Sequence, residues 1–220
     1  MAQLLIFGAG DIAELAHFYF ARDSLHTPVG FVVDAAYIKE SMFQGLPVVA
    51  LEEVRKHFPP ERCQGFVALS YAQLNALRAA KCAALEGAGY QLASYVSSRA
   101  TVFDGFVPGP NAFILEDNTI QPFVRVGRNV TMWSGNHIGH HSVIEDDVFI
   151  TSHVVVSGGV RVGRRSFLGV NATLRNHITI GERCVVGAGA LLLSDAAPEG
   201  VYMGTASERS RVPSSRLRGI

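Results

Sequence analysis

The side chains with the clearest chemical capability in this 220-residue chain are its eight histidines. His140 and His141 are adjacent, His137 lies just before them, and His153 and His177 follow further along. Because the pKa of imidazole lies near neutral pH, histidine is the usual general base of enzymes. A single exposed histidine often has no function, but an adjacent pair marks a candidate catalytic site.

The pair lies within a repeat of six residues that runs from Val96 to Leu191. Divided into sixes, this segment gives sixteen blocks, of which fourteen begin with Leu, Ile or Val. The fifth place holds Ala, Ser, Cys, Val or Asn in every block except those with Phe106 and Ile178. A period of six with an aliphatic at one place and a small residue at another predicts a parallel β-helix, in which successive coils stack. We expect three blocks, or eighteen residues, to form one triangular coil.

In such a coil the first-place and fifth-place side chains point inward and fill a narrow core. Glycine in the second place, as at Gly139, suits a tight corner with positive φ. His140 and His141 occupy the third and fourth places, so we expect them on the outside, at a corner. One coil further along, the chain places Gly158 and Gly159. The register therefore predicts a ligand slot between the two imidazoles and bare main chain.

The N-terminal residues follow a different pattern, in which apolar strands alternate with helices. Such alternation predicts a small, mainly parallel α/β sheet. The expected strands are 3–7, 30–34, 46–49 and 66–69, and the expected helices are 12–22, 51–57 and 73–87. The sequence thus divides into an α/β domain at 1–95, a β-helix at 96–192 and a C-terminal tail at 193–220.

Several residues at the ends of the expected strands form a candidate ligand site. Ligands of open α/β sheets bind at the carboxyl ends of the strands, and a strand, glycine-rich turn and helix leave free amides for a phosphate. The first strand is followed by the turn GAGD, which lacks the complete G-x-G-x-x-G spacing. The residues that we expect at this edge are Gly8, Gly10, Asp11, Asp34, Ser70 and Tyr71. Each alone also fits an ordinary turn, and their convergence is what predicts a nucleotide site.

The composition argues against several other classes of protein. The formal net charge is zero, so we expect no nucleic-acid-binding surface. Cys63, Cys82 and Cys184 are scattered and lack the spacing of a metal site or a disulfide framework. The chain has no apolar stretch long enough to span a membrane and no basic segment ahead of its first strand. We therefore expect a cytoplasmic protein without membrane contact.

The GAG turn, the strand ending in Asp34, the coil and the closing segment 199–206 (EGVYMGTA) together resemble a known family. The chain is similar to bacterial sugar acetyltransferases of the left-handed β-helix superfamily, in particular the sialic acid O-acetyltransferase type and enzymes that N-acetylate nucleotide-linked amino-deoxysugars. The resemblance covers nearly the whole chain. It implies acetyl-CoA as donor, a sugar nucleotide held by the N-terminal domain, CoA held by the coil, and a homotrimer with active sites between subunits. It also implies a role in polysaccharide synthesis, such as that of O-antigen.

The resemblance implies a catalytic histidine at this pair. The family's catalytic histidine lies in a run like I-E-H-[DE]-C-V-I-G, which matches His140 in IGHHSVIE, and the acid that follows it there is replaced by His141. A carboxylate would raise the pKa of the base and orient it, whereas we expect neither effect from a second imidazole. Either His141 is itself the base, or an acid from a neighbouring coil or subunit orients His140. Glu116 and Asp117 are candidates for that acid.

The family's ligand contacts match a further set of positions. Its nucleotide contacts match Gly10, Asp11, Ile12, Asp34, Ala35 and Ser70, where Ala35 replaces a second acid and Ser70 a glycine. Its CoA and acetyl contacts match Phe149, Gly158, Val170 and Ala188.

We therefore predict direct acetyl transfer from acetyl-CoA to an amino group of a nucleotide-linked deoxysugar. His140 would remove the proton of the attacking amine, and an amide near Gly158 or in the Ser70–Tyr71 turn would stabilise the oxyanion. No metal is expected.

Three alternatives remain open. The acceptor can be a hydroxyl of a sugar or of sialic acid. The protein can be a trimeric zinc enzyme like the β-helical carbonic anhydrases, with His137, His141 and His153 as ligands, although this leaves the glycine-rich N-terminal domain unexplained. It can also be a non-catalytic scaffold or a sensor of sugar nucleotides.

Overall fold

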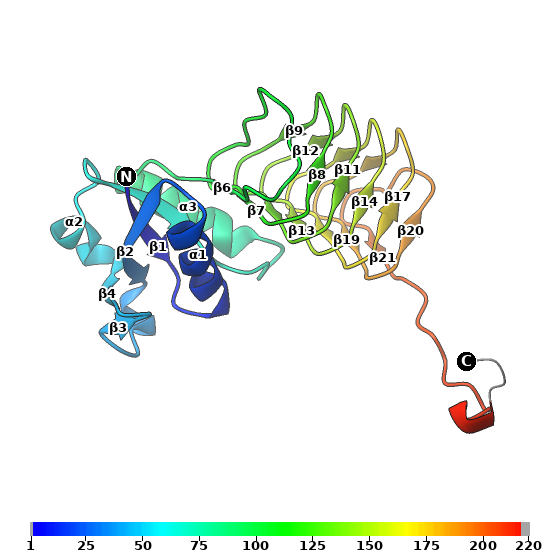
Figure 1. The fold of residues 1–220 in the computed structure, drawn as a ribbon, viewed down its shortest axis with the longest axis horizontal. Helices are drawn as coiled ribbons and strands as arrows, with labels where there is room; N and C mark the ends of the chain where they lie inside the picture. The colour runs from blue at the N-terminus through cyan, green and yellow to red at the C-terminus, as the bar shows by residue number, and fades with distance from the viewer. Residues whose placement is uncertain (1, 217–220) are drawn as a thin grey trace.

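The computed structural model describes residues 2–216 and contains two parts that pack side by side (Figure 1). An α/β layer, blue to cyan in Figure 1, is followed by a stack of triangular coils, green to orange. The C-terminal segment runs away from the last coil as an extended chain. The last residues of the predicted tail, 217–220, lie outside the described residues.

The N-terminal part is a five-stranded sheet. Its strands are β1 (Ala2–Phe7), β2 (His26–Val33), β3 (Met42–Phe43), β4 (Leu46–Ala50) and β5 (Cys63–Val67). They lie in the order β3–β4–β2–β1–β5, and all neighbours pair in parallel except β3 with β4. The mainly parallel sheet is therefore confirmed. β2 begins earlier than the expected strand at 30–34, and the short β3 was not expected.

Helices α1 (Asp11–Arg22), α2 (Val54–His57) and α3 (Ala76–Gly87) connect these strands, together with the short 3₁₀ turns η1 (Ala35–Tyr37) and η2 (Leu51–Glu53). The expected helix at 51–57 is thus divided between η2 and α2. A third 3₁₀ turn, η3 (Ser214–Arg216), lies in the C-terminal segment.

The coil consists of two-residue strands in three sheets, here called sheets I, II and III. Sheet I contains β6 (Tyr95–Val96), β7 (Phe113–Ile114), β10 (Thr131–Met132), β13 (Phe149–Ile150), β16 (Phe167–Leu168), β19 (Val185–Val186) and β21 (Val201–Tyr202). Sheet II contains β8 (Thr119–Ile120), β11 (His137–Ile138), β14 (Val155–Val156), β17 (Thr173–Leu174) and β20 (Leu191–Leu192). Sheet III contains β9 (Arg125–Val126), β12 (Val143–Ile144), β15 (Arg161–Val162) and β18 (Thr179–Ile180).

Successive coils pair in parallel with an offset of eighteen residues. Thr131 lies beside Phe149 in sheet I, and His137 lies beside Val155 in sheet II. The predicted coil of three six-residue blocks is confirmed. The pairing of β21 with β19 continues the coil beyond the expected domain boundary at residue 192.

The inside of the coil is a narrow aliphatic core. First-place residues such as Ile138 and Ile150, and fifth-place residues such as Val148 and Cys184, have no exposed surface. Ile178, although larger than most fifth-place residues, is only 6% exposed. These residues hold each coil in register, because their burial supplies the main favourable free energy of stacking.

The corners of the coil differ from the expectation that second-place glycines have positive φ. Every fourth-place residue from Gly105 to Gly189 has positive φ instead; Asn111, Asp117 and His141 have values of 59°, 59° and 60°. The second-place glycines are required by close approach between coils. A Cβ atom at Gly139 would lie 2.5 Å from the amide nitrogen of the next coil.

The α/β layer packs on the outer face of sheet I. Phe66 of β5, Tyr95 and Phe113 belong to one buried cluster that extends from the α/β layer into the coil. The Phe66 and Phe113 rings are 5.3 Å apart, and Tyr95 also donates a hydrogen bond of 2.7 Å to Asp23. The two parts are thus joined by a shared core as well as by the chain.

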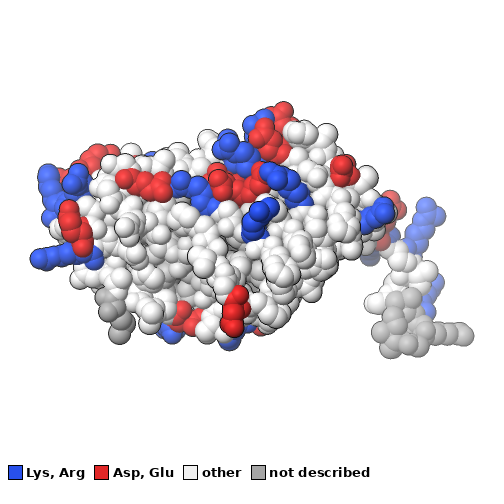
Figure 2. Space-filling model, turned by 90° about the horizontal axis from the view of Figure 1, so that it is seen from above, with Lys and Arg blue, Asp and Glu red and all other residues white. Residues whose placement is uncertain are grey.

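The face of the molecule shown in Figure 2 is not strongly basic, and the described helices include none that could span a membrane. In Figure 2, Lys and Arg side chains are interspersed with Asp and Glu, and neither sign forms a continuous field. Within residues 2–216, none of the helices combines the length and the apolar character that crossing a bilayer requires.

We expect Gly163→Ala to lower the free energy of unfolding by about 1–3 kcal/mol, because overpacking at a backbone contact forces the coils apart. The added Cβ atom would lie 2.6 Å from the amide nitrogen of Glu182. Ser157→Ala, at a second place that already carries a Cβ atom, should change it by less than about 0.5 kcal/mol. Urea unfolding measures both, and equal stabilities would contradict this account of the glycines.

Candidate functional site

His140 and His141 lie on the outside of the coil, at the corner between β11 and β12. Both side chains are exposed, while Ile138 and Ser142 on either side have no exposed surface. The buried neighbours fix the main chain, so the two imidazoles project from a rigid corner. Their Nδ1 atoms are 3.1 Å apart, within hydrogen-bonding distance.

The His140 ring lies against the main chain of Gly158, one coil further along, as the register predicts. A Cβ atom at Gly158 would be 2.7 Å from both Cε1 and Nε2 of the ring. The amide of His140 donates to Gln121 Oε1 at 2.8 Å. The edge of the imidazole that carries Nε2 is therefore held beside bare main chain.

The amide of Gly158 has no hydrogen-bond acceptor within residues 2–216. At two other third places the amide does have an acceptor nineteen residues earlier: Arg164 donates to Glu145 Oε2 at 2.9 Å, and His140 donates to Gln121 Oε1 at 2.8 Å. The residue nineteen places before Gly158 is Gly139, which has no side chain to offer. The sequence thus leaves one uncapped donor beside the imidazole of His140.

The position of His141 is also fixed, but the main chain of Gly159, which was predicted to face it, is covered by another side chain. The ring packs on exposed Phe123, with 4.7 Å between centroids. The space over Gly159 is filled from the other side by His177, whose Nδ1 would lie 2.4 Å from a Cβ atom at Gly159. Bare main chain is therefore presented to His140 and not to His141.

The two acids considered as partners of the base do not contact it within one chain. Glu116 accepts hydrogen bonds from Tyr19 at 2.9 Å and from Ser134 at 2.8 Å. Burial would raise the pKa of Glu116, but the hydrogen bonds from its own amide, Ser134 and Tyr19 together hold the pKa below its usual value. Glu116 and Asp117 lie at the corner between sheets I and II.

The second candidate site is a cavity of about 650 Å³ at the carboxyl ends of the parallel strands. It is lined by Phe7, Gly8, Ala9, Val33, Asp34, Tyr37, Lys39, Glu40, Met42, Phe43, Val48, Leu69, Leu77 and Lys81. Of the predicted substrate residues, Gly8 and Asp34 are in this lining. Gly10, Asp11, Ile12, Ala35, Ser70 and Tyr71 are not.

Two features of this cavity concern its chemistry. Gly8 has a φ of 127°, and a Cβ atom there would be 2.7 Å from the carbonyl oxygen of Ala68, so the turn after β1 requires glycine. Asp34 Oδ1 forms an ion pair with Lys81 Nζ at 2.6 Å, and both side chains are half-buried. Sequence reasoning missed Lys81, because its helix was recognised but its orientation toward Asp34 was not.

Tyr71 links the two parts of the molecule. Its ring packs on Phe149 at 5.2 Å and on Phe167 at 4.8 Å, both from sheet I. Phe149 is only 2% exposed, so it lies between the domains and is not open to a CoA molecule in this arrangement. Val170 and Ala188 are exposed, at the corner between sheets I and II.

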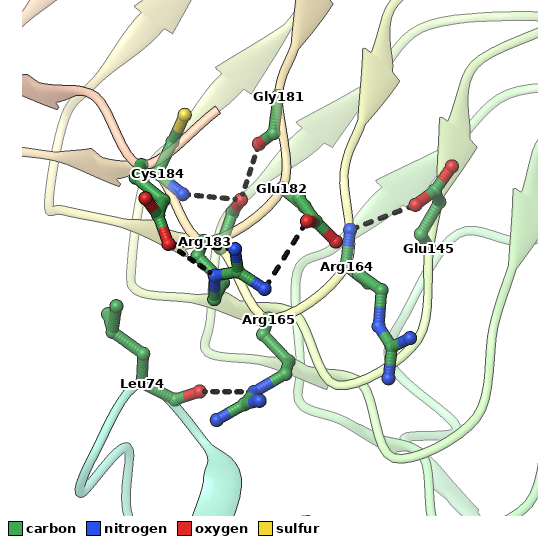
Figure 3. Close-up of polar contacts among 10 residues, drawn as sticks. Leu74, Glu145, Arg164, Arg165, Gly181, Glu182, Arg183 and Cys184 are labelled. Carbon is green, nitrogen blue, oxygen red and sulfur yellow. Dashed lines mark hydrogen bonds and ion pairs between the residues drawn. The ribbon is translucent and has the colours of Figure 1, made fainter. Parts of the chain in front are cut away.

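The turn after Tyr71 has an unusual conformation. Gln73, Leu74 and Asn75 have φ values of 53°, 47° and 64°, and three successive left-handed residues prevent α3 from starting at the expected residue 73. Arg165 of the coil donates from Nε to the carbonyl oxygen of Leu74 at 3.4 Å, which ties the turn to the coil (Figure 3).

Arg78 is a further residue that the sequence did not reveal. Its side chain is 1% exposed and donates to Asn129 Oδ1 at 3.0 Å, to the Asn129 carbonyl at 2.7 Å and to Thr131 Oγ1 at 2.8 Å. Burial lowers its pKa to about 10, which still leaves it charged at neutral pH. Asp147 nearby accepts from Asn129 Nδ2 at 2.7 Å and balances this charge. Helix α3 thus faces the cavity with Lys81 and the coil with Arg78.

The imidazole pair and the cavity lie on different sides of the coil. The three sheets are the sides of a triangular prism, and each corner is opposite one sheet. The pair occupies the corner between sheets II and III, whereas the α/β layer covers sheet I, the opposite side. One chain therefore does not bring its own cavity to its own imidazole pair.

Within residues 2–216, no group of three or more His, Cys, Asp or Glu side chains is arranged to hold a metal ion. Of the three histidines in the zinc alternative, His137 lies in β11, and His141 and His153 lie at different corners.

Comparison with known proteins places the chain among hexapeptide-repeat folds. Residues 159–194 match the family model of the hexapeptide repeat of succinyl-transferase. The chain is 26% identical over 132 residues to an acyl-[acyl-carrier-protein]–UDP-N-acetylglucosamine O-acyltransferase of Campylobacter concisus. That match covers 57% of this chain and 49% of the relative, so the chain spans about half the length of the curated relative that it matches.

Solved structures match over both parts. A histidine-to-asparagine variant of perosamine N-acetyltransferase from Caulobacter crescentus, in complex with CoA and GDP-perosamine, has a TM-score of 0.82 at 22% identity, covering 93% of this chain and 94% of that chain. The acetyltransferase domain of PglB from Neisseria gonorrhoeae, in complex with acetyl coenzyme A, has a TM-score of 0.80 at 23% identity, covering 92% and 96%. The fold is therefore an α/β domain followed by a left-handed parallel β-helix, as the resemblance implied.

We expect Arg78→Met to lower the free energy of unfolding by about 3–5 kcal/mol, because it leaves the buried Asp147 without its opposite charge and removes four hydrogen bonds. The control is Lys56→Met, whose side chain is 73% exposed and should cost less than about 0.5 kcal/mol. Chemical denaturation of both variants measures the difference. A small effect of Arg78→Met would contradict the role of this network in joining the domains.

Proposed function

We propose that the protein transfers an acetyl group from acetyl-CoA to an amino group of a nucleotide-linked deoxysugar. The observation that carries the proposal is the His140 imidazole held beside the uncapped amide of Gly158. A general base next to a free hydrogen-bond donor is the arrangement that acyl transfer needs. The solved structures of similar fold, which contain CoA or acetyl-CoA and GDP-perosamine, support the choice of donor and acceptor.

The reaction is a direct transfer. The sugar amine attacks the thioester carbonyl as His140 Nε2 takes up its proton, which forms the C–N bond and a tetrahedral oxyanion. The oxyanion accepts a hydrogen bond from the Gly158 amide. Collapse of this intermediate breaks the C–S bond, and the proton held by His140 passes to the CoA thiolate as it leaves. None of the three cysteines lies at this corner, so the proposal involves no acyl-enzyme.

The sugar nucleotide occupies the cavity of the α/β domain. Asp34 and Lys81 supply a paired acceptor and donor there, and Gly8 forms the turn after β1 that lines the cavity. Gly10, Asp11 and Ile12 at the start of α1, Ala35 in η1, and the exposed Ser70 and Tyr71 complete the proposed substrate set. They lie beyond the cavity lining, where the phosphates and sugar would extend toward a neighbouring chain.

The active site is formed between subunits of a homotrimer. The cavity and the imidazole pair of one chain lie on opposite sides of the prism, so a second copy must supply one of them. The exposed Val170 and Ala188, at another corner, are free to contact CoA bound beside a neighbouring chain. Phe149, under Tyr71, is left out of this set. We also propose a cytoplasmic location, where acetyl-CoA is available.

His140→Ala should lower kcat for acetyl transfer by about 10²–10⁴-fold, the usual contribution of a general base. Binding of CoA and of the sugar nucleotide should persist, and thermal shifts with CoA and with GDP-, UDP- and dTDP-sugars measure it. His153→Ala is the control and should keep its activity. Near wild-type turnover of His140→Ala would refute the base, and nucleotide binding without any turnover in the wild type would favour the sensor alternative.

Mixing two inactive variants tests the shared site. Asp34→Ala removes the proposed nucleotide contact and His140→Ala removes the base, so each homotrimer should be inactive. Co-expressed chains should recover activity, because mixed trimers contain sites with an intact cavity from one chain and an intact His140 from another. Absence of recovery in trimers shown to be mixed would mean that each site belongs to a single chain.

A further inference from the structure

We propose that His141 is a positioning residue that fixes the tautomer of His140 and leaves its Nε2 free to act as the base. The role of His140 as the base rests on the proposed function, whereas the hydrogen bond between the two rings does not.

The hydrogen bond itself dictates the tautomers. The two Nδ1 atoms are 3.1 Å apart, so one carries the proton and the other accepts it. If His140 donates, its Nε2 has a lone pair and His141 is protonated on Nε2. The free amide of Gly158 lies beside the Nε2 edge of His140, whereas the ring of His141 is packed on Phe123. The geometry therefore selects His140 as donor and base, and His141 as acceptor.

The main chain and its neighbours hold His141 in this role. Its φ of 60° is imposed by the fourth place of the coil, so its side chain leaves the corner in a fixed direction. Histidine is among the residues that tolerate this region, as are asparagine and aspartate. The contact of 4.7 Å with the Phe123 ring restricts the imidazole further. An imidazole thus supplies the orientation that we expected only from an acid.

No charged side chain belongs to the stretches of adjacent coils at this corner, within residues 2–216. The coil before presents 121–123 (QPF), and the coil after presents 157–159 (SGG). The charged or titratable groups on the adjoining faces and further along the corner are Asp104, Arg125, His137, Arg161, Arg175 and His177. Arg161 is already paired with Glu145, and Arg175 donates to the Leu193 carbonyl.

The first test observes the tautomers directly in the whole protein. Nitrogen-15 NMR of histidine-labelled wild type should show His140 protonated on Nδ1 and unprotonated on Nε2, and the reverse for His141. In His141→Ala the signal of His140 should lose this pattern. An unchanged His140 pattern in His141→Ala, or the reverse assignment in the wild type, would overturn the proposal. This measurement does not depend on any enzymatic activity.

The second test is kinetic. His141→Ala should lower kcat by at least about tenfold with little change in KM, as expected when an orienting partner is lost. His141→Asp should retain activity, because a carboxylate also accepts a hydrogen bond from Nδ1. Equal losses of kcat in His141→Ala and His141→Asp would refute the positioning role.

Matched variants separate positioning from folding. His153→Ala and His153→Asp alter another fourth-place histidine, with a φ of 58°, that covers Gly135 and not a base. They should show the same change in melting temperature as the His141 variants but no change in kcat. If the wild type transfers acetyl to none of the sugar nucleotides tested, the proposed function fails, and the NMR spectra alone decide whether His141 fixes the tautomer.

Discussion

The stacking of successive coils at an offset of eighteen residues is the constraint on which the rest of the structure depends. Burial of the first-place and fifth-place side chains holds each coil over the next, and the fourth-place corners turn through positive φ. The same offset brings Gly158 against the ring of His140 and aligns Gly139 with the Gly158 amide. Gly139 has no side chain to accept a hydrogen bond from the Gly158 amide, and Gly158 has no side chain to displace the His140 ring. The imidazole therefore lies beside a free hydrogen-bond donor.

Much of this architecture is predictable from the sequence because it repeats. A period of six fixes the coil, its register, the outward direction of His140 and the glycine facing it. The predicted backbone conformation of the corners is wrong, since second-place glycines are as compatible with positive φ as with close packing, and only the three-dimensional structure distinguishes the two. The sequence also could not reveal Arg78 or Lys81. Their roles depend on how α3 is rotated between the sheet and the coil, which no local pattern specifies.

Helix α3 connects the cavity physically to the coil. Lys81 meets Asp34 in the cavity, while Arg78, on the same helix, is buried against Asn129 of the coil. The orientation of the cavity is therefore set by a buried, charged contact and by the Tyr71 ring on sheet I. This packing directs the cavity away from the chain's own imidazole pair, and it makes assembly with further copies part of the proposed mechanism.

The most direct test of the central claim is a crystal structure of the assembled protein with CoA and a sugar nucleotide bound. The account predicts that the sulfur of CoA lies within reach of His140 Nε2 and the Gly158 amide, and that the nucleotide in the cavity of a neighbouring chain extends its sugar to the same point. A CoA sulfur bound at another corner, or a nucleotide whose sugar points away from every His140, would contradict it.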